Sequence, residues 1–190
     1  MKLYLIRHGQ TEANLRHLYC GSTDLPLSDA GREALLGIQY PKPEKADYIT
    51  SGMVRCNETM ELLFHPDSMA VCPDLREIDF GIFEMRGYGE LKDDPAYQAW
   101  ISGDNMANTP PGGESGLDMT RRVMAAFREI LRRGKDAVIV THGGVIATIM
   151  AECFSGENRN RYQWQPAPGC GYLLTCACGE LTYEPLIPIV

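Results

Sequence analysis

The sequence predicts an α/β fold with a mainly parallel central sheet. Two short apolar runs, 3–6 and 137–141, break directly into glycine-containing turns, which is typical of strands buried on both faces of a parallel sheet. Strand-like and helix-like segments alternate along the chain, and this alternation favours a parallel sheet covered by helices. A chain of 190 residues fits one folding unit, so we expect a single domain over residues 1–190.

Capping residues, prolines and apolar periodicity predict the other elements. Ser28 is a candidate N-cap, and Ser115 forms a capping box with Asp118. Residues 9–27 and 73–113 are rich in turn formers, and a long irregular segment inside a compact domain is uncommon unless it is functional. The expected elements are a helix over 28–39, a strand over 47–50, a helix between Ser51 and Pro66, a strand over 68–72, short helices near Glu90 and over 96–101, a helix over 115–134, a helix from 145, and an edge hairpin of strands over 171–176 and 181–183.

Composition and charge exclude several classes of partner. The formal net charge of −7 disfavours general binding to nucleic acid or to anionic membranes, so we expect neither partner. The apolar run at the N-terminus is too short for a signal peptide, and none approaches the ~20 residues that span a bilayer. Seven scattered cysteines suit reduced thiols rather than disulfides. The chain is therefore expected to be cytoplasmic.

The two apolar strands end alike, in Arg7-His8-Gly9 and in Thr141-His142-Gly143-Gly144. Either histidine alone could be a packed core residue. Because ligands in open α/β sheets bind beyond the carboxyl ends of the strands, two such ends favour a shared site.

Cations and backbone amides near these strand ends suit a phosphate. Arg7 and Arg55 carry guanidinium forks that match phosphate oxygens, and the helix after Gly144 would direct its N–H groups at an anion. Arg55 alone would be a solvated helix charge, but its place just after the second strand brings it to the same edge of the sheet.

Such a pocket predicts phosphoryl transfer to His8. A histidine nucleophile needs one unprotonated ring nitrogen, with the other N–H held by an acceptor such as the Gly9 carbonyl. His142, if protonated by the anionic ligand, would stabilise the transferring group. The leaving alkoxide needs a proton donor, for which Glu77 and Asp79 are the better candidates, and position alone does not separate them.

The chain resembles the histidine phosphatase superfamily, the phosphoglycerate-mutase-like enzymes. The resemblance rests on Leu5 to Asn14, on Gly21 to Gly31, on Thr50 to Thr59, on Leu75 to Glu84 and on Val140 to Gly144. It implies a three-layer α/β/α sandwich that uses neither metal nor cofactor. The roles that it implies are His8 as the phosphorylated nucleophile, Arg7, Arg55 and His142 as the phosphate pocket, Glu77 as the acid, and Asn14, Thr11, Gly143, Cys20 and Gly21 as further contacts to substrate or phosphate.

The expected activity is hydrolysis of a small phosphomonoester. Family mutases carry a longer insertion after the acid, whereas only some two dozen residues separate Glu84 from Pro110 here. The segment 110–115 resembles small bacterial phosphatases, including those acting on α-ribazole phosphate, which is a candidate substrate; phosphoglycerate mutase is the alternative. Aromatic side chains near the presumed mouth could stack on a flat base or simply pack the short helices: Phe80, Phe83, Tyr88, Tyr97 and Trp100.

Three rival classes can be tested. A hydrolytic metal site lacks the usual histidine spacing, and activity undiminished by a chelator would remove it. A nucleotide-binding module lacks both glycine-rich phosphate motifs. A catalytically idle phosphate-binding protein would release no phosphate from any monoester. The sequence leaves monomer and homodimer open.

Overall fold

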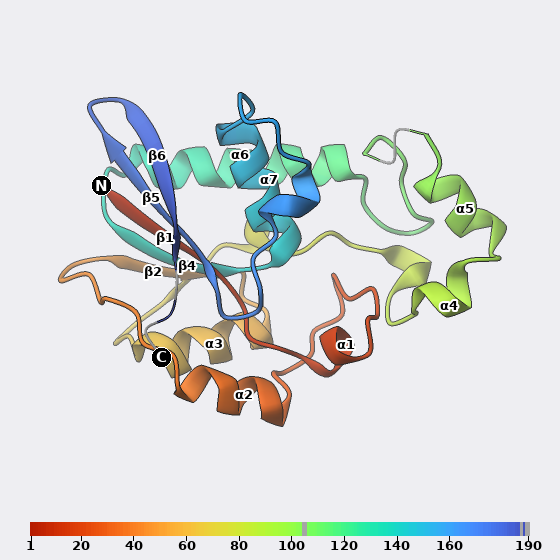
Figure 1. Ribbon diagram of the computed structural model, residues 1–190, viewed down its shortest axis with the longest axis horizontal. Helices are drawn as coiled ribbons and strands as arrows, with labels where there is room; N and C mark the ends of the chain where they lie inside the picture. The colour runs from red at the N-terminus through yellow and green to blue at the C-terminus, as the bar shows by residue number, and fades with distance from the viewer. Residues whose placement is uncertain (104–105, 187, 189–190) are drawn as a thin grey trace.

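Six strands form one mixed sheet in the order β3-β2-β4-β1-β5-β6 (Figure 1). The computed structural model describes residues 1–103, 106–186 and 188. Strands β1 to β4 are mutually parallel, and β5 and β6 add an antiparallel hairpin at one edge. The bounds are Lys2–Arg7 for β1, Asp47–Thr50 for β2, Ala70–Val71 for β3, Ala137–Thr141 for β4, Gly171–Ala177 for β5 and Glu180–Leu186 for β6.

Helices cover both faces of the sheet, as Figure 1 shows. On one face lie α6 (Gly116–Arg132) and α7 (Gly143–Cys153), and on the other α2 (Asp29–Leu36) and α3 (Val54–Phe64). Two separate clusters of buried apolar side chains, one on each face, accompany these two layers. The predicted three-layer α/β/α sandwich is confirmed.

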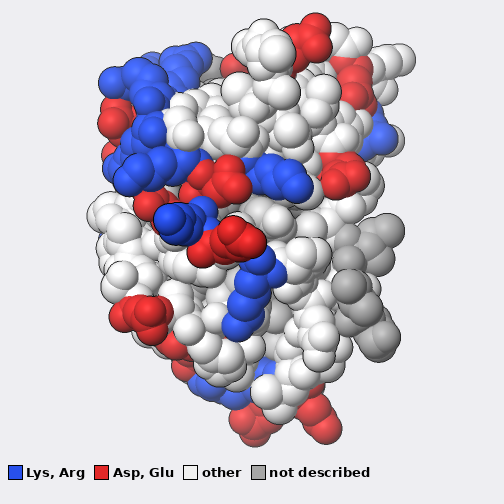
Figure 2. Space-filling view, turned by 90° about the vertical axis from the view of Figure 1, so that its left-hand side faces the viewer, with Lys and Arg blue, Asp and Glu red and all other residues white. Residues whose placement is uncertain are grey.

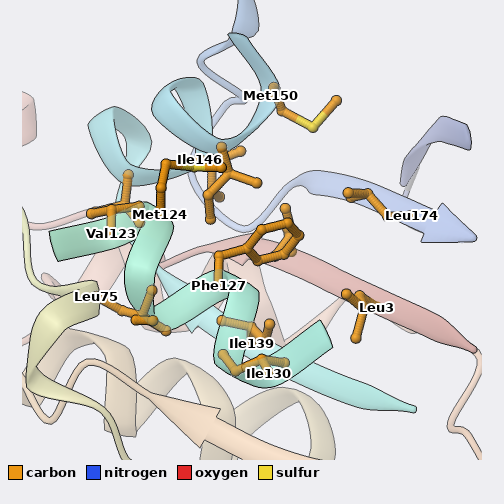
Figure 3. Packing of buried hydrophobic residues seen from close by; sticks show 14 of the residues in the cluster. Leu3, Leu75, Val123, Met124, Phe127, Ile130, Ile139, Ile146, Met150 and Leu174 are labelled. Carbon is orange, nitrogen blue, oxygen red and sulfur yellow. The ribbon is translucent and has the colours of Figure 1, made fainter. Parts of the chain in front are cut away.

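The core under α6 follows from its apolar stripe. Val123, Phe127 and Ile130 are buried at helical spacing and point toward the sheet (Figure 3). Ile146 and Met150 of α7 join them from above. Burying a side chain of this size contributes about 1.5–3 kcal/mol, so this cluster fixes α7, and with it the turn after β4.

Short elements gather beyond the carboxyl ends of the parallel strands (Figure 1). They are α1 (Glu12–Leu15), η1 (Pro73–Leu75), η2 (Gly81–Phe83), α4 (Tyr88–Leu91), α5 (Pro95–Ile101) and η3 (Arg161–Trp164).

Among the described residues, no helix is both long enough and apolar enough to cross a membrane.

Two sequence expectations were wrong in detail. The segment 9–27, predicted as loop, contains α1, which Thr11 begins through a capping box with Asn14; four residues are too few to show an apolar period. The helix predicted over 28–39 ends at Leu36, because Gly37 is its C-cap residue. The predicted N-caps Ser28 and Ser115 were right.

Charged side chains on the face opposite the short helices do not form a field of one sign. Across the middle of the face in Figure 2, blue and red atoms lie side by side. Arg133 approaches Asp47 at 3.8 Å, and Arg132 pairs with Glu129 at 2.6 Å, both between partly exposed side chains. Pairs of this kind contribute little to stability. Basic side chains also gather at the upper left of Figure 2.

Candidate active site

The pairing of β1 with β4 brings His8 and His142 together. The register sets Arg7 opposite Thr141, and the His8 N–H donates to the Thr141 carbonyl at 2.8 Å. The next residues along each strand are therefore neighbours, and the two imidazole centroids lie 5.2 Å apart at an interplanar angle of 65°. The shared site predicted from the two strand ends is present.

The imidazole of His8 is held as a neutral base. Its Nδ1 lies 2.7 Å from the Gly9 carbonyl, and this acceptor requires the proton on Nδ1 and leaves the lone pair on Nε2. The Gly9 N–H in turn donates to Thr59 Oγ1 at 2.9 Å. Burial, the charge of Arg55 and then that of Arg7 lower the pKa of His8 to about 3, although the Gly9 contact opposes them.

Both ring nitrogens of His142 bind protein groups. Arg55 Nε donates to Nδ1 at 3.3 Å, and Nε2 lies 2.9 Å from Ser51 Oγ. Burial holds the pKa of His142 well below its usual range, with the His8 ring and Arg55 acting in the same direction. The protein groups alone therefore keep this ring neutral, and the expected protonated form requires the negative charge of a phosphoryl group beside it.

Arg55 is fully enclosed at the start of α3, with 1% of its surface exposed. Its two terminal nitrogens donate to the carbonyls of Gly21 and Thr23, both at 2.9 Å. The sequence predicted Gly21 as a contact to the ligand, whereas in the structure its carbonyl orients the arginine. Its lack of a side chain is required, since a Cβ would lie 1.6 Å from the Ile78 carbonyl oxygen.

Glu84 anchors the loop that orients Arg55. Its carboxylate accepts from the N–H groups of Gly21, Ser22 and Thr23 and from the Thr23 hydroxyl, at 2.7–3.2 Å. Cys20, also predicted near the ligand, directs its thiol to the Thr23 carbonyl at 3.6 Å. Sequence reasoning ranked Glu84 behind Glu77 and Asp79 as a candidate acid and did not predict this anchoring role, because nothing in its spacing shows that four donors about 60 residues away converge on it.

Arg7 has free donor capacity at the pocket. Its Nη1 donates to the Pro166 carbonyl at 2.8 Å, while its buried Nε meets no acceptor among the described residues. Gly143 packs on the guanidinium, and a Cβ there would lie 3.2 Å from Arg7 Cζ. Burial lowers the pKa of Arg7 and nearby Glu77 raises it. A buried N–H without a partner is a donor available to a ligand.

The structure separates the two candidate acids by position. Glu77 reaches the first turn of α7, where the Gly144 N–H donates to Oε2 at 2.9 Å. Asp79 instead accepts from Ser22 Oγ at 3.0 Å and from the Gly81 N–H at 2.8 Å, within its own turn. Only Glu77 lies on the side of the two histidines, so the prediction of Glu77 as the acid gains geometric support.

Arg122 of α6 holds the backbone that carries Glu77. It donates to the carbonyls of Asp74, Arg76 and Glu77 at 2.7–3.1 Å, and Glu114 pairs with it at 2.7 Å. Sequence reasoning missed Arg122, since an arginine on a helix reads as a solvated charge. Its only sequence signal is Glu114, eight residues earlier and directly before Ser115, the N-cap of α6.

Thr11 and Asn14 form the N-terminal cap of α1. Asn14 Oδ1 accepts from the backbone N–H and the hydroxyl of Thr11, both at 3.1 Å. This pairing orients the Asn14 amide, so that Nδ2 is the group left to bind an anion. Thr11, predicted as a ligand contact, acts on Asn14 in this structure.

A cavity of about 310 Å³ adjoins Glu77 and Gly144. Part of the aromatic cluster of the short helices lines it: the Tyr19 and Phe80 rings lie 5.0 Å apart, and the Phe80 and Trp100 rings 5.9 Å. Phe83 and Tyr97 are buried inside this cluster, as expected for side chains that pack the short helices. Phe80 and Trp100 line the cavity, and stacking on a flat base stays a prediction. In the described part of the chain, no three His, Cys, Asp or Glu side chains cluster so as to hold a metal.

Comparisons with known proteins agree with this geometry. The adenosylcobalamin/α-ribazole phosphatase of Salmonella typhimurium is 29% identical, covering 98% of this chain and 96% of its own. A 2,3-bisphosphoglycerate-dependent phosphoglycerate mutase of Gloeobacter violaceus is 31% identical over 79% of this chain and 74% of its own. A crystal structure of a putative α-ribazole-5′-P phosphatase from Escherichia coli superimposes with a TM-score of 0.87 at 25% identity, covering 98% and 95%.

The family model of the histidine phosphatase superfamily (branch 1) matches residues 3–184. The predictions of this family and of a phosphatase are confirmed. The chain belongs to the histidine phosphatase superfamily, branch 1.

Proposed function

We propose that this phosphatase hydrolyses a small phosphomonoester through a phosphohistidine on His8. One observation carries the proposal: the Nδ1–H of His8 binds the Gly9 carbonyl at 2.7 Å, which leaves the Nε2 lone pair free to attack. A pKa of about 3 keeps the imidazole unprotonated at any physiological pH. His8 therefore needs no general base to become a nucleophile.

The reaction takes two steps. His8 Nε2 attacks phosphorus, the bond from phosphorus to the ester oxygen breaks, and protonated Glu77 gives its proton to the leaving alkoxide. Water then attacks the phosphohistidine, Glu77 takes a proton from that water, and the bond from Nε2 to phosphorus breaks. Inorganic phosphate leaves, and both His8 and Glu77 return to their starting forms.

The charge of the transferring group would be met by Arg7, Arg55 and His142. Arg55 is already oriented by two backbone carbonyls. Protonation of His142 would put a proton on Nδ1 and replace its hydrogen bond from Arg55 Nε, which would free both groups to donate to phosphoryl oxygens. The unpaired Nε of Arg7 would bind a phosphoryl oxygen, and the dianion would favour the protonated form of His142. Asn14 Nδ2 would add a donor from α1.

Hydrolysis is favoured over mutase activity by the cavity beside Glu77. A phosphoglycerate carries a carboxylate besides its phosphate, and a mutase must bind it while excluding water. The cavity is instead walled largely by aromatic and apolar side chains, with Arg161 the cation that lines it among the described residues. The similarity to mutases as well as phosphatases keeps mutase activity as the second candidate.

We propose α-ribazole phosphate as the substrate. Support comes from the relatives named for this activity, which match almost the whole chain, and from the aromatic wall of the cavity, which suits a flat base. A panel of monoesters, including α-ribazole phosphate and phosphoglycerates, scored for phosphate release against isomerisation, tests the choice.

The His8→Ala variant tests the mechanism. It should abolish turnover and acid-labile phosphate labelling of the protein, because no other residue described here offers a comparable nucleophile. The exposed His17 provides a control, and His17→Asn should keep both. Labelling that survives in His8→Ala would place the nucleophile elsewhere, and wild-type protein that releases no phosphate from any monoester would favour the idle binding protein.

A further inference from the structure

The cavity beside Glu77 has the shape of a binding site for the leaving group. Glu77, which would protonate the ester oxygen, is one of its lining residues, and neither histidine is. The aromatic side chains of Phe80 and Trp100 and the apolar side chains of Ile78 and Met119 also line it. Flat rings beside apolar side chains suit a planar apolar body.

Arg161, at the start of η3, brings a charge to this mainly apolar space. Its Nη2 binds the Thr148 hydroxyl and lies 3.8 Å from the sulfur of Met119, while Nη1 lies 2.7 Å from that of Met106. No carboxylate of the described residues lies within ion-pair distance of it. Thioether sulfur is a weak acceptor, so a half-buried guanidinium with five N–H donors keeps unmet capacity. A partly buried guanidinium with spare donors beside a cavity can bind an acceptor atom of a ligand.

Arg161 is linked to the acid through the first turn of α7. The Thr148 hydroxyl that accepts from Arg161 donates to the Gly144 carbonyl at 2.7 Å, and the Gly144 N–H binds Glu77. Residues 144 and 148 are one helical turn apart, ~5–6 Å. An ester oxygen at Glu77 and an acceptor atom at Arg161 can therefore belong to one small molecule.

We propose that Arg161 is a specificity residue that binds a hydrogen-bond acceptor on the leaving group, in a subsite for a flat, mostly apolar alcohol. The proposal rests on the proposed phosphatase activity, which supplies the ester. Arg161 takes no part in bond breaking. Its acceptor is a ring nitrogen or carbonyl in a nucleoside-like alcohol. A preference for the carboxylate of a hydroxy acid instead is the outcome that 3-phosphoglycerate tests.

The test compares Arg161→Met with Arg161→Lys on four compounds. α-Ribazole phosphate carries a flat base with an acceptor, benzyl phosphate a flat ring without one, and 3-phosphoglycerate a carboxylate without a ring. Inorganic phosphate, measured as a competitive inhibitor, occupies only the phosphate pocket. Arg128→Met, an exposed arginine of α6, is the matched control.

Loss of a charged hydrogen bond should lower kcat/KM of Arg161→Met about tenfold to a hundredfold for the ester whose acceptor it binds, mainly through KM. Benzyl phosphate turnover and phosphate inhibition should change less than about twofold, and Arg161→Lys should restore part of the loss. If kcat/KM for benzyl phosphate and inhibition by phosphate weaken as much as kcat/KM for the acceptor-bearing ester, Arg161 only supports α7. If the ratio of kcat/KM between the esters is the same in Arg161→Met and in wild type, Arg161 is not part of the subsite.

Failure of the proposed activity would look different. In that case the wild-type protein releases no phosphate from any ester, while calorimetric binding of the same compounds still measures the preference for an acceptor. If wild type binds the compounds with an acceptor more tightly and Arg161→Met does not, the subsite is supported even though no ester is hydrolysed. Equal binding by wild type and variant would overturn it.

Discussion

The two ends of the active site are built in different ways. At the phosphate end, two buried side chains are bound by backbone carbonyls: Arg55 by those of Gly21 and Thr23, and His8 by that of Gly9. His142 is held there by the side chains of Arg55 and Ser51. At the leaving-group end, aromatic side chains pack on one another, and Arg161 has weak partners. The first end is prearranged for one ligand, a phosphoryl group.

The difference follows from which elements carry each end. The phosphate end lies at the carboxyl ends of β1 and β4 and the start of α3, where sheet register fixes positions. The other end is lined by residues of the short elements α5 and η3, of seven and four residues, together with residues of α6, α7 and neighbouring loops. A change of substrate can therefore arise in these short elements without disturbing the chemistry.

Glu77 stands between the two ends, and its replacement should produce the largest effect. Glu77→Gln keeps the size of the side chain but cannot donate the proton. Its single amide oxygen can accept from the N–H of Gly144 or of Ile78, so one of the two contacts is lost. We expect kcat/KM for an alkyl monoester to fall about 10²–10⁴-fold, and that for an aryl phosphate far less, because a phenolate leaves without protonation. Steady-state rates on glycerol phosphate and 4-nitrophenyl phosphate measure the difference.

Equal losses on both esters would assign Glu77 to the phosphate end, as a binding group. Asp79→Asn is the matched control, because Asp79 caps its own turn through Ser22 and Gly81. It should alter both rates by a similar factor.

The prearranged phosphate end should also destabilise the protein in acid. The pKa of His8 is about 3 in the folded state and ~6.5 in the unfolded chain, so the unfolded chain binds more protons between these values. The unfolding free energy therefore decreases as pH falls from 6.5 toward 3, by about 2 kcal/mol at pH 5 for this one group.

Denaturant unfolding of wild type and His8→Gln at pH 7.5 and pH 5 measures the contribution of His8 to the pH dependence of the unfolding free energy. The variant should lose about 2 kcal/mol less between the two pH values. Burial lowers the pKa of His142 in both proteins, whereas the effect of the His8 ring on that pKa is absent from the variant. An identical loss in both proteins would mean that His8 titrates normally and that the pocket does not hold it neutral.

The sequence predicted the phosphate end better than the leaving-group end, for physical reasons. His8, His142 and Arg55 follow strand ends, and sheet topology brings such ends together regardless of detail. Glu84 and Arg122 were missed because their partners are backbone groups distant in sequence, and a lone charged residue does not show what it binds. Arg161 was missed in the same way, since η3 is too short to show periodicity.

The two glycines after His142 allow the two ends of the active site to be compared with single substitutions. Gly143 contacts a residue of the phosphate end, and Gly144 contacts Glu77, next to the leaving-group end. Gly143 packs on Arg7, whereas a Cβ on Gly144 would lie 2.4 Å from Glu77 Oε1. Gly144 is inside α7, where alanine is favoured by up to ~1 kcal/mol, and the obstructing atom is the end of a flexible side chain. Gly144→Ala should therefore fold at least as stably as wild type but with Glu77 displaced.

We expect Gly144→Ala to lower kcat/KM about tenfold for alkyl monoesters and to spare aryl phosphates, as a displaced acid would. Gly156→Ala is the control, because a Cβ there meets nothing within 4 Å. Combining Gly144→Ala with Glu77→Gln should add little to the loss in Glu77→Gln alone, since both act on one proton transfer. Additive losses would mean that the new methyl group obstructs the phosphate itself, and the division of the two glycines between the two ends would then be wrong.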